Sequence, residues 1–345
     1  MSLQPKSPHK ILIIRFSSLG DIIQCLTAAD HLAARFPGAP IHWVTRSDFA
    51  ELVATHPQLQ KTWSLDRKGG LSALLRLAQE LRRQNFTHLY DAHSNVRSHI
   101  LSWILRFPGP GRIPHFLRRG KSRLKRWLLF RLGWKLLPWP YHGAQSFVWP
   151  LGPWGIKWDT KHSHGLNLTD LKPDTRQLLK WPASECLLLA PSAAWEMKRW
   201  PVDYWQTLIA HLPQAKFMIL GGPQDHFLDE IQKVAPERVQ NLAGLLSWNE
   251  SARLVSECGG LVSGDTGLLH LGDYLGRPTW ALIGPTAFGF PSWPNSHTFE
   301  VDLPCRPCTK DGRGECRIKE VRKCLIDIKP ESVASELNQQ LKLQV

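Results

Sequence analysis

The chain has 345 residues, of which 43% are apolar and 21% charged, and this length favours two folded domains. The composition excludes a disordered, collagen-like or coiled-coil protein. Lys and Arg (43) exceed Asp and Glu (29) by 14, so we expect an anionic partner: a phosphate, a nucleic acid or an acidic membrane surface.

The sequence offers no candidate for a membrane span or a secretory signal. No run of about 18 apolar residues occurs, and the apolar stretch at residues 11–16 is too short for either role. The seven cysteines are an odd number in a chain without a signal, which argues against a secreted disulfide framework. We therefore expect a cytoplasmic protein.

Short apolar runs alternate with amphipathic stretches along the chain, which is typical of βαβ units in a parallel sheet. The predicted strands are residues 11–16, 41–45, 87–90, 186–190, 216–220, 259–263 and 279–283. The predicted helices are residues 21–36, 69–84, 96–107, 201–212, 225–235, 249–257 and 266–275. The pattern occurs twice, so we predict an α/β protein of two Rossmann-like domains facing a cleft.

A stretch rich in Pro, Gly, Trp and Lys near residues 150–182 lacks periodicity and marks the domain boundary. We place the domains at residues 1–165 and 166–328. In residues 329–345, Val333, Leu337 and Leu341 recur every fourth position, which predicts an amphipathic helix that packs back on the domains.

Nearly the whole charge excess lies in one stretch. Residues 92–158 contain twelve Lys and Arg residues and no Asp or Glu. Between residues 118 and 139, basic side chains alternate with Leu, Phe and Trp, as on a surface that meets an anionic amphiphile. The alternative is a solvated basic helix whose apolar face packs on the sheet.

Ligands of open α/β sheets bind beyond the carboxyl ends of the strands, so the turns that follow the strands are the places to search. The first turn, FSSLGD, brings Asp21 to the start of a helix. Asp21 is either a helix-capping carboxylate or a catalytic one. The turn lacks the GxGxxG pattern, which disfavours a dinucleotide-dependent oxidoreductase.

Four turns in the second half carry groups suited to a nucleotide. The turn PSAAWEMKRWP holds Lys198 and Arg199, which suit a diphosphate. The turn GGPQDH lets the backbone approach a ligand and offers Asp225 to ribose hydroxyls. The turns GDTGLLH and GPT follow the last two predicted strands. Each turn can be purely structural, but four of them together predict a nucleotide site.

The motifs RFSSLGDIIQCLTA, WEMKRWP, SGDTGLLHL and LGRPTWALIGPT, in this order, resemble the bacterial ADP-heptose:lipopolysaccharide heptosyltransferases, glycosyltransferase family nine. The resemblance implies a GT-B fold, with an N-terminal domain that binds the acceptor and a C-terminal domain that binds the nucleotide sugar. It also implies inverting transfer of a heptose from ADP-heptose to the lipid A/Kdo inner core of lipopolysaccharide. Asp21 matches the family's general base, and Lys198 matches the lysine that contacts the donor phosphates.

The resemblance and the turn positions together give two candidate sites. The expected donor-binding residues are Ser192, Lys198, Asp225, Asp265, Thr266, Gly267, Leu268, His270 and Thr286. The expected acceptor-binding residues are Ser18, Gly20, Arg46, Asn95, Arg97, Arg118, Arg119 and Arg123. No DxD string occurs, so we expect Lys198 and backbone donors to hold the diphosphate, with no cofactor or catalytic metal required.

Four cysteines cluster near the C-terminus. Cys305, Cys308, Cys316 and Cys324 form one CxxC pair followed by two single residues, a spacing that only partly matches zinc sites. A structural zinc ion and reduced thiols are equal alternatives, and a local disulfide is a third.

Two other functions stay open. The chain is either a related transferase that uses another nucleotide sugar, or a non-catalytic basic protein that binds nucleic acid or a membrane. No known nucleic-acid-binding motif is present. We therefore expect a peripheral enzyme at the inner-membrane surface with no nucleic-acid partner.

Overall fold

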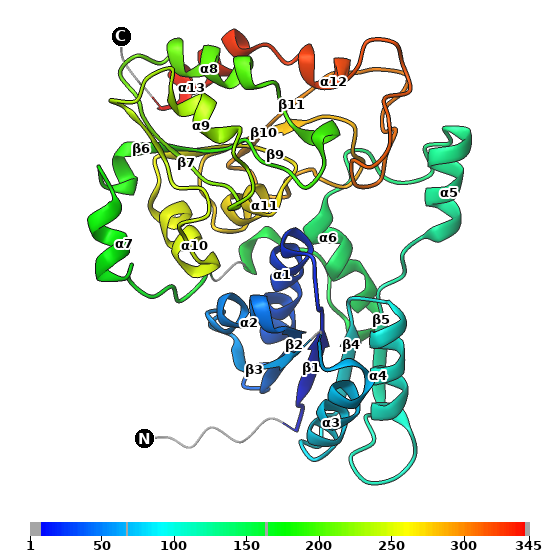
Figure 1. The fold of residues 1–345 in the computed structure, drawn as a ribbon. Helices are drawn as coiled ribbons and strands as arrows, with labels where there is room; N and C mark the ends of the chain where they lie inside the picture. Colours follow the sequence, from blue (N-terminus) through cyan, green and yellow to red (C-terminus); the bar gives the residue numbers. More distant parts are fainter. Residues whose placement is uncertain (1–7, 67, 163–164, 342–345) are drawn as a thin grey trace. The chain divides into compact units, whose positions relative to one another are not determined.

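The protein contains two parallel β-sheets in two compact units, which confirms the predicted α/β class (Figure 1). The structure is a computed structural model that describes residues 8–66, 68–162 and 165–341. The first unit comprises Met1–Arg123 and Ala144–Asn167, and the second comprises Leu124–Gly143 and Leu168–Val345. The chain thus enters the second unit, returns to the first and then crosses again.

The first unit is built on a five-stranded sheet with the order β3-β2-β1-β4-β5. Its strands are β1 (Ile11–Ile14), β2 (Ile41–Arg46), β3 (Leu59–Leu65), β4 (His88–Asp91) and β5 (His115–Arg118). Its helices are α1 (Leu19–Arg35), α2 (Ser47–Ala54), α3 (Gly70–Arg82), α4 (Val96–Arg106) and α6 (Gly143–Val148). Apolar side chains of α3 and α4 pack on one face of the sheet, where Leu77 and Leu101 belong to the same buried cluster as Leu12. The strand β1 is buried along its whole length because it lies in the centre.

The second unit contains a six-stranded sheet with the order β11-β10-β9-β6-β7-β8. Its strands are β6 (Cys186–Ala190), β7 (Lys216–Ile219), β8 (Val239–Asn241), β9 (Gly260–Gly264), β10 (Thr279–Ile283) and β11 (Ser296–Glu300). Its helices are α7 (Pro173–Leu178), α8 (Val202–Ala210), α9 (Leu228–Gln232), α10 (Trp248–Glu257), α11 (Gly267–Tyr274), α12 (Lys323–Ile326) and α13 (Pro330–Leu341). The terminal helix α13 packs against α8 and buries Val333 and Leu337 in the core.

A basic segment within the predicted N-terminal domain packs on the second unit. We call residues 124–143, which include nearly all of α5 (Arg123–Leu132), the basic strap. The rings of Phe130 and Tyr141 stack edge-on against Phe288, and Arg317 donates a hydrogen bond of 2.7 Å to the carbonyl of Phe130. The strap is therefore part of the second unit's surface.

All seven predicted strands are present, with ends shifted by two residues at most. The four additional strands, β3, β5, β8 and β11, are the edges of the two sheets. Among the described residues, no helix combines the length and the apolar character needed to cross a bilayer.

Burial of His88 predicts that acid destabilises the protein. The side chain is 5% exposed, and burial together with His115 and His9 lowers the pKa of His88 from 6.5 to about 4. Between these two values the unfolded chain binds a proton that the folded chain does not. The free energy of unfolding should therefore fall as the pH drops, by up to about 1.4 kcal/mol per pH unit for this group.

The variant His88→Phe removes this titration and keeps an aromatic ring. Its melting temperature should fall less between about pH 7 and about pH 5 than that of the wild type. His211 lies on the surface and is the control, because His211→Phe should leave the slope unchanged. Equal slopes for wild type and His88→Phe would contradict the assignment.

Candidate active site

The second unit brings four predicted donor-site residues into one cluster at the carboxyl ends of β6, β9 and β10. Asp265 follows β9, and its carboxylate pairs with Lys198 Nζ at 2.9 Å and with His270 Nε2 at 3.5 Å. Thr286, beyond β10, donates a hydrogen bond of 2.7 Å to the same carboxylate. The turns that follow β6, β9 and β10 thus meet through direct side-chain contacts.

The electrostatics of the cluster keep Asp265 ionised. Burial alone would raise the pKa of the Asp265 carboxyl, but the Lys198 ammonium, His270 and Thr286 together lower it far below its ordinary value. Asp265 therefore stays negatively charged, and its carboxylate fixes the position of the Lys198 ammonium.

The helix α11 starts beside this ion pair. Thr266 is its N-cap residue, and its Oγ1 accepts a hydrogen bond from the backbone N–H of Leu269. The N–H groups of the first helical residues, Gly267 and Leu268, have no partner within a helix. Such a helix start favours an anion, and here it lies next to a lysine.

Asp225 forms a second polar group in the same unit. Its Oδ2 accepts hydrogen bonds from Ser192 Oγ at 2.5 Å and from the backbone N–H of Gly222 at 2.8 Å. Arg199 lies 3.5 Å from the other carboxylate oxygen and donates two hydrogen bonds to the carbonyl of Ala193. Arg199, which the sequence suggested for a diphosphate, instead contacts Asp225 and Ala193 and so links the turn after β6 to the turn after β7.

A segment that the sequence analysis considered only for its cysteines supports Lys198. Gly312 has a φ of +92°, and a Cβ at this position would lie 2.6 Å from Lys198 Cγ and 3.2 Å from Trp195 Cβ. The Arg313 guanidinium lies over the Trp195 ring, 4.9 Å from its centroid. Arg322 donates to the carbonyl of Glu196 at 3.3 Å. Residues 312–322, near the C-terminus, therefore pack against the turn that bears Lys198 and hold it in place.

The four C-terminal cysteines are free thiols. Cys305, Cys308 and Cys316 are half-buried, whereas Cys324 is buried, and burial raises the pKa of the Cys324 thiol to about 12. In the described part of the chain, no group of three or more His, Cys, Asp or Glu side chains is arranged to hold a metal ion.

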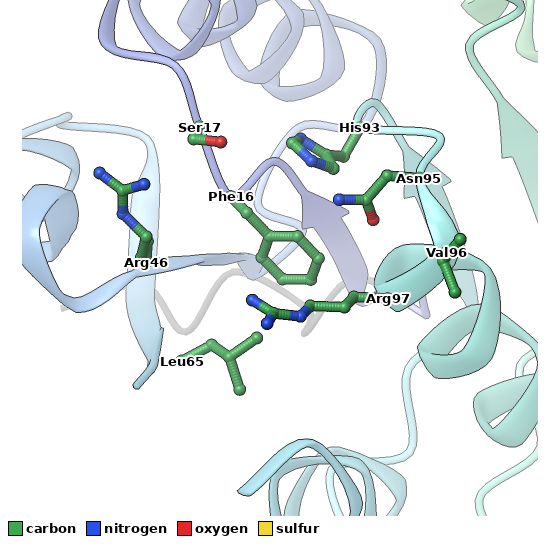
Figure 2. A pocket seen from close by; sticks show the side chains of 8 residues that line it. All are labelled: Phe16, Ser17, Arg46, Leu65, His93, Asn95, Val96 and Arg97. Atoms are coloured by element: carbon green, nitrogen blue, oxygen red, sulfur yellow. The ribbon is translucent and has the colours of Figure 1, made fainter. Parts of the chain in front are cut away.

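The first unit has a cavity of about 460 Å³ at the carboxyl ends of β1 to β4 (Figure 2). Three of the predicted acceptor residues, Arg46, Asn95 and Arg97, line it together. The other lining residues are Phe16, Ser17, Leu65, His93 and Val96. We call this cavity the acceptor pocket, after the role expected for those three residues.

The three predicted residues differ in how firmly they are held. Arg46 pairs with Asp48 and lies over the Phe49 ring. Asn95 caps α4, where its Oδ1 accepts a hydrogen bond of 2.9 Å from the backbone N–H of Ser98. Arg97 is exposed and has no hydrogen-bond or ion-pair partner within the described ranges. Arg97 is therefore the cation of the pocket that is most available to an anion.

Asp21 lies in the first turn of α1, directly after the strand end that lines the pocket. Ser18 Oγ donates a hydrogen bond of 2.8 Å to Asp21 Oδ2, and Arg15 NH2 lies 2.6 Å from the same oxygen. The Arg15 guanidinium is buried, whereas the Asp21 side chain is 40% exposed. The Asp21 carboxylate is thus held by a buried guanidinium and by a hydroxyl group, and part of its surface is open to solvent.

The remaining predicted acceptor residues lie outside the pocket. Gly20 is part of the first turn of α1. Arg118 donates to the buried carboxylate of Asp91 at 2.8 Å. Arg119 is buried, and its guanidinium donates to Ser146 O at 3.2 Å and Ser146 Oγ at 2.6 Å. Arg123 is exposed at the start of α5. Arg118 and Arg119 therefore stabilise the position of β5 within the first unit.

Known proteins match this chain over nearly its whole length. The family model of glycosyltransferase family 9 (heptosyltransferase) matches residues 154–321. Lipopolysaccharide heptosyltransferase 1 of Pseudomonas aeruginosa is 25% identical over 96% of this chain and 98% of that relative, and lipopolysaccharide heptosyltransferase 2 of Escherichia coli is 24% identical over 95% and 97%. The solved structure of E. coli ADP-heptose lps heptosyltransferase II has a TM-score of 0.71 at 21% identity and covers 96% of this chain and 98% of its own. These matches confirm the resemblance drawn from the motifs and the GT-B fold.

The contact between Gly312 and Lys198 predicts a selective effect on nucleotide binding. In Gly312→Ala, the new methyl group must displace the Lys198 side chain, so we expect the affinity for ADP to fall about tenfold, which corresponds to about 1.4 kcal/mol. Isothermal titration calorimetry measures this change.

Gly314 is a matched control. Its φ of +91° equals that of Gly312 within a degree, but a Cβ there meets nothing within 4 Å. Gly314→Ala carries the same backbone strain and should bind ADP like the wild type. An equal loss of affinity in both variants would show that strain, and not the contact with Lys198, is responsible.

Proposed function

We propose that this chain, which is similar to the heptosyltransferases of glycosyltransferase family nine over nearly its whole length, transfers a heptose from ADP-heptose to the lipid A/Kdo inner core of lipopolysaccharide. It is a glycosyltransferase of lipopolysaccharide core assembly; the donor, the acceptor and the stereochemistry are the proposal. The observation that carries it is the cluster of Lys198, Asp265, His270 and Thr286 at the strand ends of the second unit.

The second unit is proposed to bind the donor. The Lys198 ammonium and the N-terminus of α11 offer positive charge to a diphosphate. Asp265 holds that ammonium in place before the donor binds, so little reorganisation is needed when charge develops on the leaving ADP. Ser192 and Asp225, beside the turn after β7, are proposed to contact the ribose hydroxyls.

The first unit is proposed to bind the acceptor and to supply the base. An acceptor hydroxyl oxygen forms a bond to the anomeric carbon as its proton passes to the Asp21 carboxylate. The bond between that carbon and the phosphate oxygen breaks, and ADP leaves with the electron pair without needing a proton. A single displacement of this kind inverts the anomeric centre. Arg46 and Arg97 are proposed to bind the acidic groups of the acceptor.

The basic strap is proposed to hold the enzyme at the anionic surface of the inner membrane. Leu124, Trp127 and Leu132 of α5 are more than half exposed, although these side chains are apolar. Lys125 and Arg131 are exposed on the same helix. Apolar and cationic side chains that share one exposed helix favour peripheral binding to acidic headgroups.

Loss of the base should slow transfer without affecting donor binding. We expect Asp21→Asn to lower kcat by a factor of about 100, because the hydroxyl proton then has no acceptor. ADP release from ADP-heptose in the presence of a Kdo-containing acceptor measures kcat, and calorimetry with ADP measures donor-site binding. A panel with GDP- and UDP-linked sugars tests whether another donor is used.

Asp203 provides the control for this variant. It is also a carboxylate in the first turn of a helix, α8, so Asp203→Asn matches the loss of charge at a helix start. Its kcat should equal that of the wild type. Near-normal turnover by Asp21→Asn would remove Asp21 from the mechanism.

Charge reversal in the strap should weaken membrane binding. We expect the double variant Lys125→Glu, Arg131→Glu to lose at least about tenfold in affinity for vesicles that contain acidic phospholipid, because each cation contributes about 1 kcal/mol near such a surface. Cosedimentation with vesicles measures this affinity. The control is Lys233→Glu, Lys319→Glu, which makes the same charge change at exposed sites elsewhere. Equal binding by both variants would contradict a specific role of the strap.

A further inference from the structure

The acceptor pocket contains an imidazole whose nitrogens have no hydrogen bond. His93 lies beyond the end of β4 and is only 9% exposed. Its Nδ1 is fully buried without a partner, and its Nε2 has no hydrogen bond to the described residues either. Nε2, unlike Nδ1, is not fully buried, so it is the nitrogen of this pocket-lining ring that a ligand can reach. Polar groups at such sites are nearly always hydrogen-bonded, and Nε2 is free to make a bond that the described residues do not supply.

The position of His93 is fixed by its backbone. The N–H groups of His93 and Ser94 donate to Asp91 Oδ1 at 3.1 Å and 2.9 Å, and Asp91 is fully buried. The ring also packs edge-on against Phe16, with 5.1 Å between centroids. The imidazole is therefore held at the pocket wall.

His93 is uncharged at neutral pH. Burial lowers the pKa of His93 to about 3, and the positive charges of Arg15 and Lys121 add to this effect. A neutral imidazole has one N–H donor and one nitrogen acceptor, so it can accept a hydrogen bond from a hydroxyl group, which Arg and Lys cannot do. The ring thus complements the two guanidinium groups of the pocket.

We propose that His93 is a substrate-binding residue that hydrogen-bonds a hydroxyl group of a carboxylated sugar held in the acceptor pocket. This inference rests on the proposed function and names the acceptor chemistry of that site. Figure 2 shows Arg46, His93, Asn95 and Arg97 around the Phe16 ring. Arg97, assisted by Arg46, binds the carboxylate, and the Asn95 amide and the His93 imidazole bind hydroxyls. Phe16 and Leu65 provide apolar contact for the sugar ring.

The chemistry of these groups distinguishes a carboxylated sugar from a simple anion. Two guanidinium groups alone suit phosphate or carboxylate equally. A neutral imidazole and an amide next to them suit a ligand that presents hydroxyl groups beside its negative charge. The pocket wall closest to the Asp21 turn, formed by Phe16 and Ser17, then brings such a ligand near the proposed base.

The test compares two variants of His93 with a nearby histidine. His93→Phe keeps the ring and removes both nitrogens, whereas His93→Gln keeps a donor and an acceptor. His99 lies on α4 outside the pocket lining, and its Nε2 lies 3.4 Å from Ser94 Oγ, so His99→Phe is the control. Kinetics with ADP-heptose and a Kdo-containing acceptor give both KM values and kcat.

We expect His93→Phe to raise the acceptor KM about tenfold while the donor KM changes less than about twofold. His93→Gln should restore most of the acceptor affinity, and His99→Phe should behave like the wild type. A structural role would instead lower the melting temperature of both His93 variants without this split between the two KM values. An unchanged acceptor KM in His93→Phe would overturn the proposal.

Two further measurements keep the result unambiguous. The melting temperature and the affinity for ADP, which depends on the second unit, show whether each variant is folded. If His93→Phe unfolds, His93→Leu replaces it. Calorimetry with a water-soluble Kdo disaccharide measures acceptor binding without any donor. If the wild type binds this disaccharide but transfers no heptose, the proposed function fails and the role of His93 is still decided. If His93→Phe binds the disaccharide as tightly as the wild type, the inference fails alone.

Discussion

The parallel pairing of β9 with β6 on one side and with β10 on the other is the constraint on which the donor cluster depends. Ala190 pairs with Ser263, and Leu282 pairs with Gly264, so the three strands end within about two residues of each other. Their turns therefore leave the same edge of the sheet. Residues almost 90 positions apart, Lys198 and Thr286, reach one carboxylate because of this register.

Each unit pairs a carboxylate of its candidate site with a mostly buried cation. In the first unit this pair is Asp21 with Arg15, and in the second it is Asp265 with Lys198. Taking both charges out of water is costly, so such a pair adds little to stability by itself. In both pairs the partner fixes the position of the charged group before any substrate binds, and the roles that we propose for Asp21 and Lys198 depend on such fixed positions.

The excess of positive charge is distributed by the path of the chain. The basic strap lies in the sequence between β5 and α6, two elements of the first unit. Its aromatic residues nevertheless pack on Phe288 and Phe290 of the second unit. The basic stretch of the sequence is therefore divided between the two units. Arg118 and Arg119 stabilise the first unit from inside, whereas Lys125 and Arg131 stay on the surface.

The sequence by itself determined the central strands, the turns that follow them and the family. Central strands are buried on both faces, so their sequences are continuous apolar runs. The candidate donor residues follow shortly after those runs in the sequence. The edge strands β3, β5 and β11 escaped prediction because solvent reaches them and polar residues such as those of LQKTWSL interrupt the apolar pattern. The edge strand β8 is mostly buried, but its three residues are too few to form a recognisable apolar run. Only the tertiary structure brought Gly312 against Lys198, Arg199 to Asp225 and His93 into the acceptor pocket. These relations join segments that no local pattern connects, because packing of distant turns, and not the propensity of neighbouring residues, sets which side chains touch.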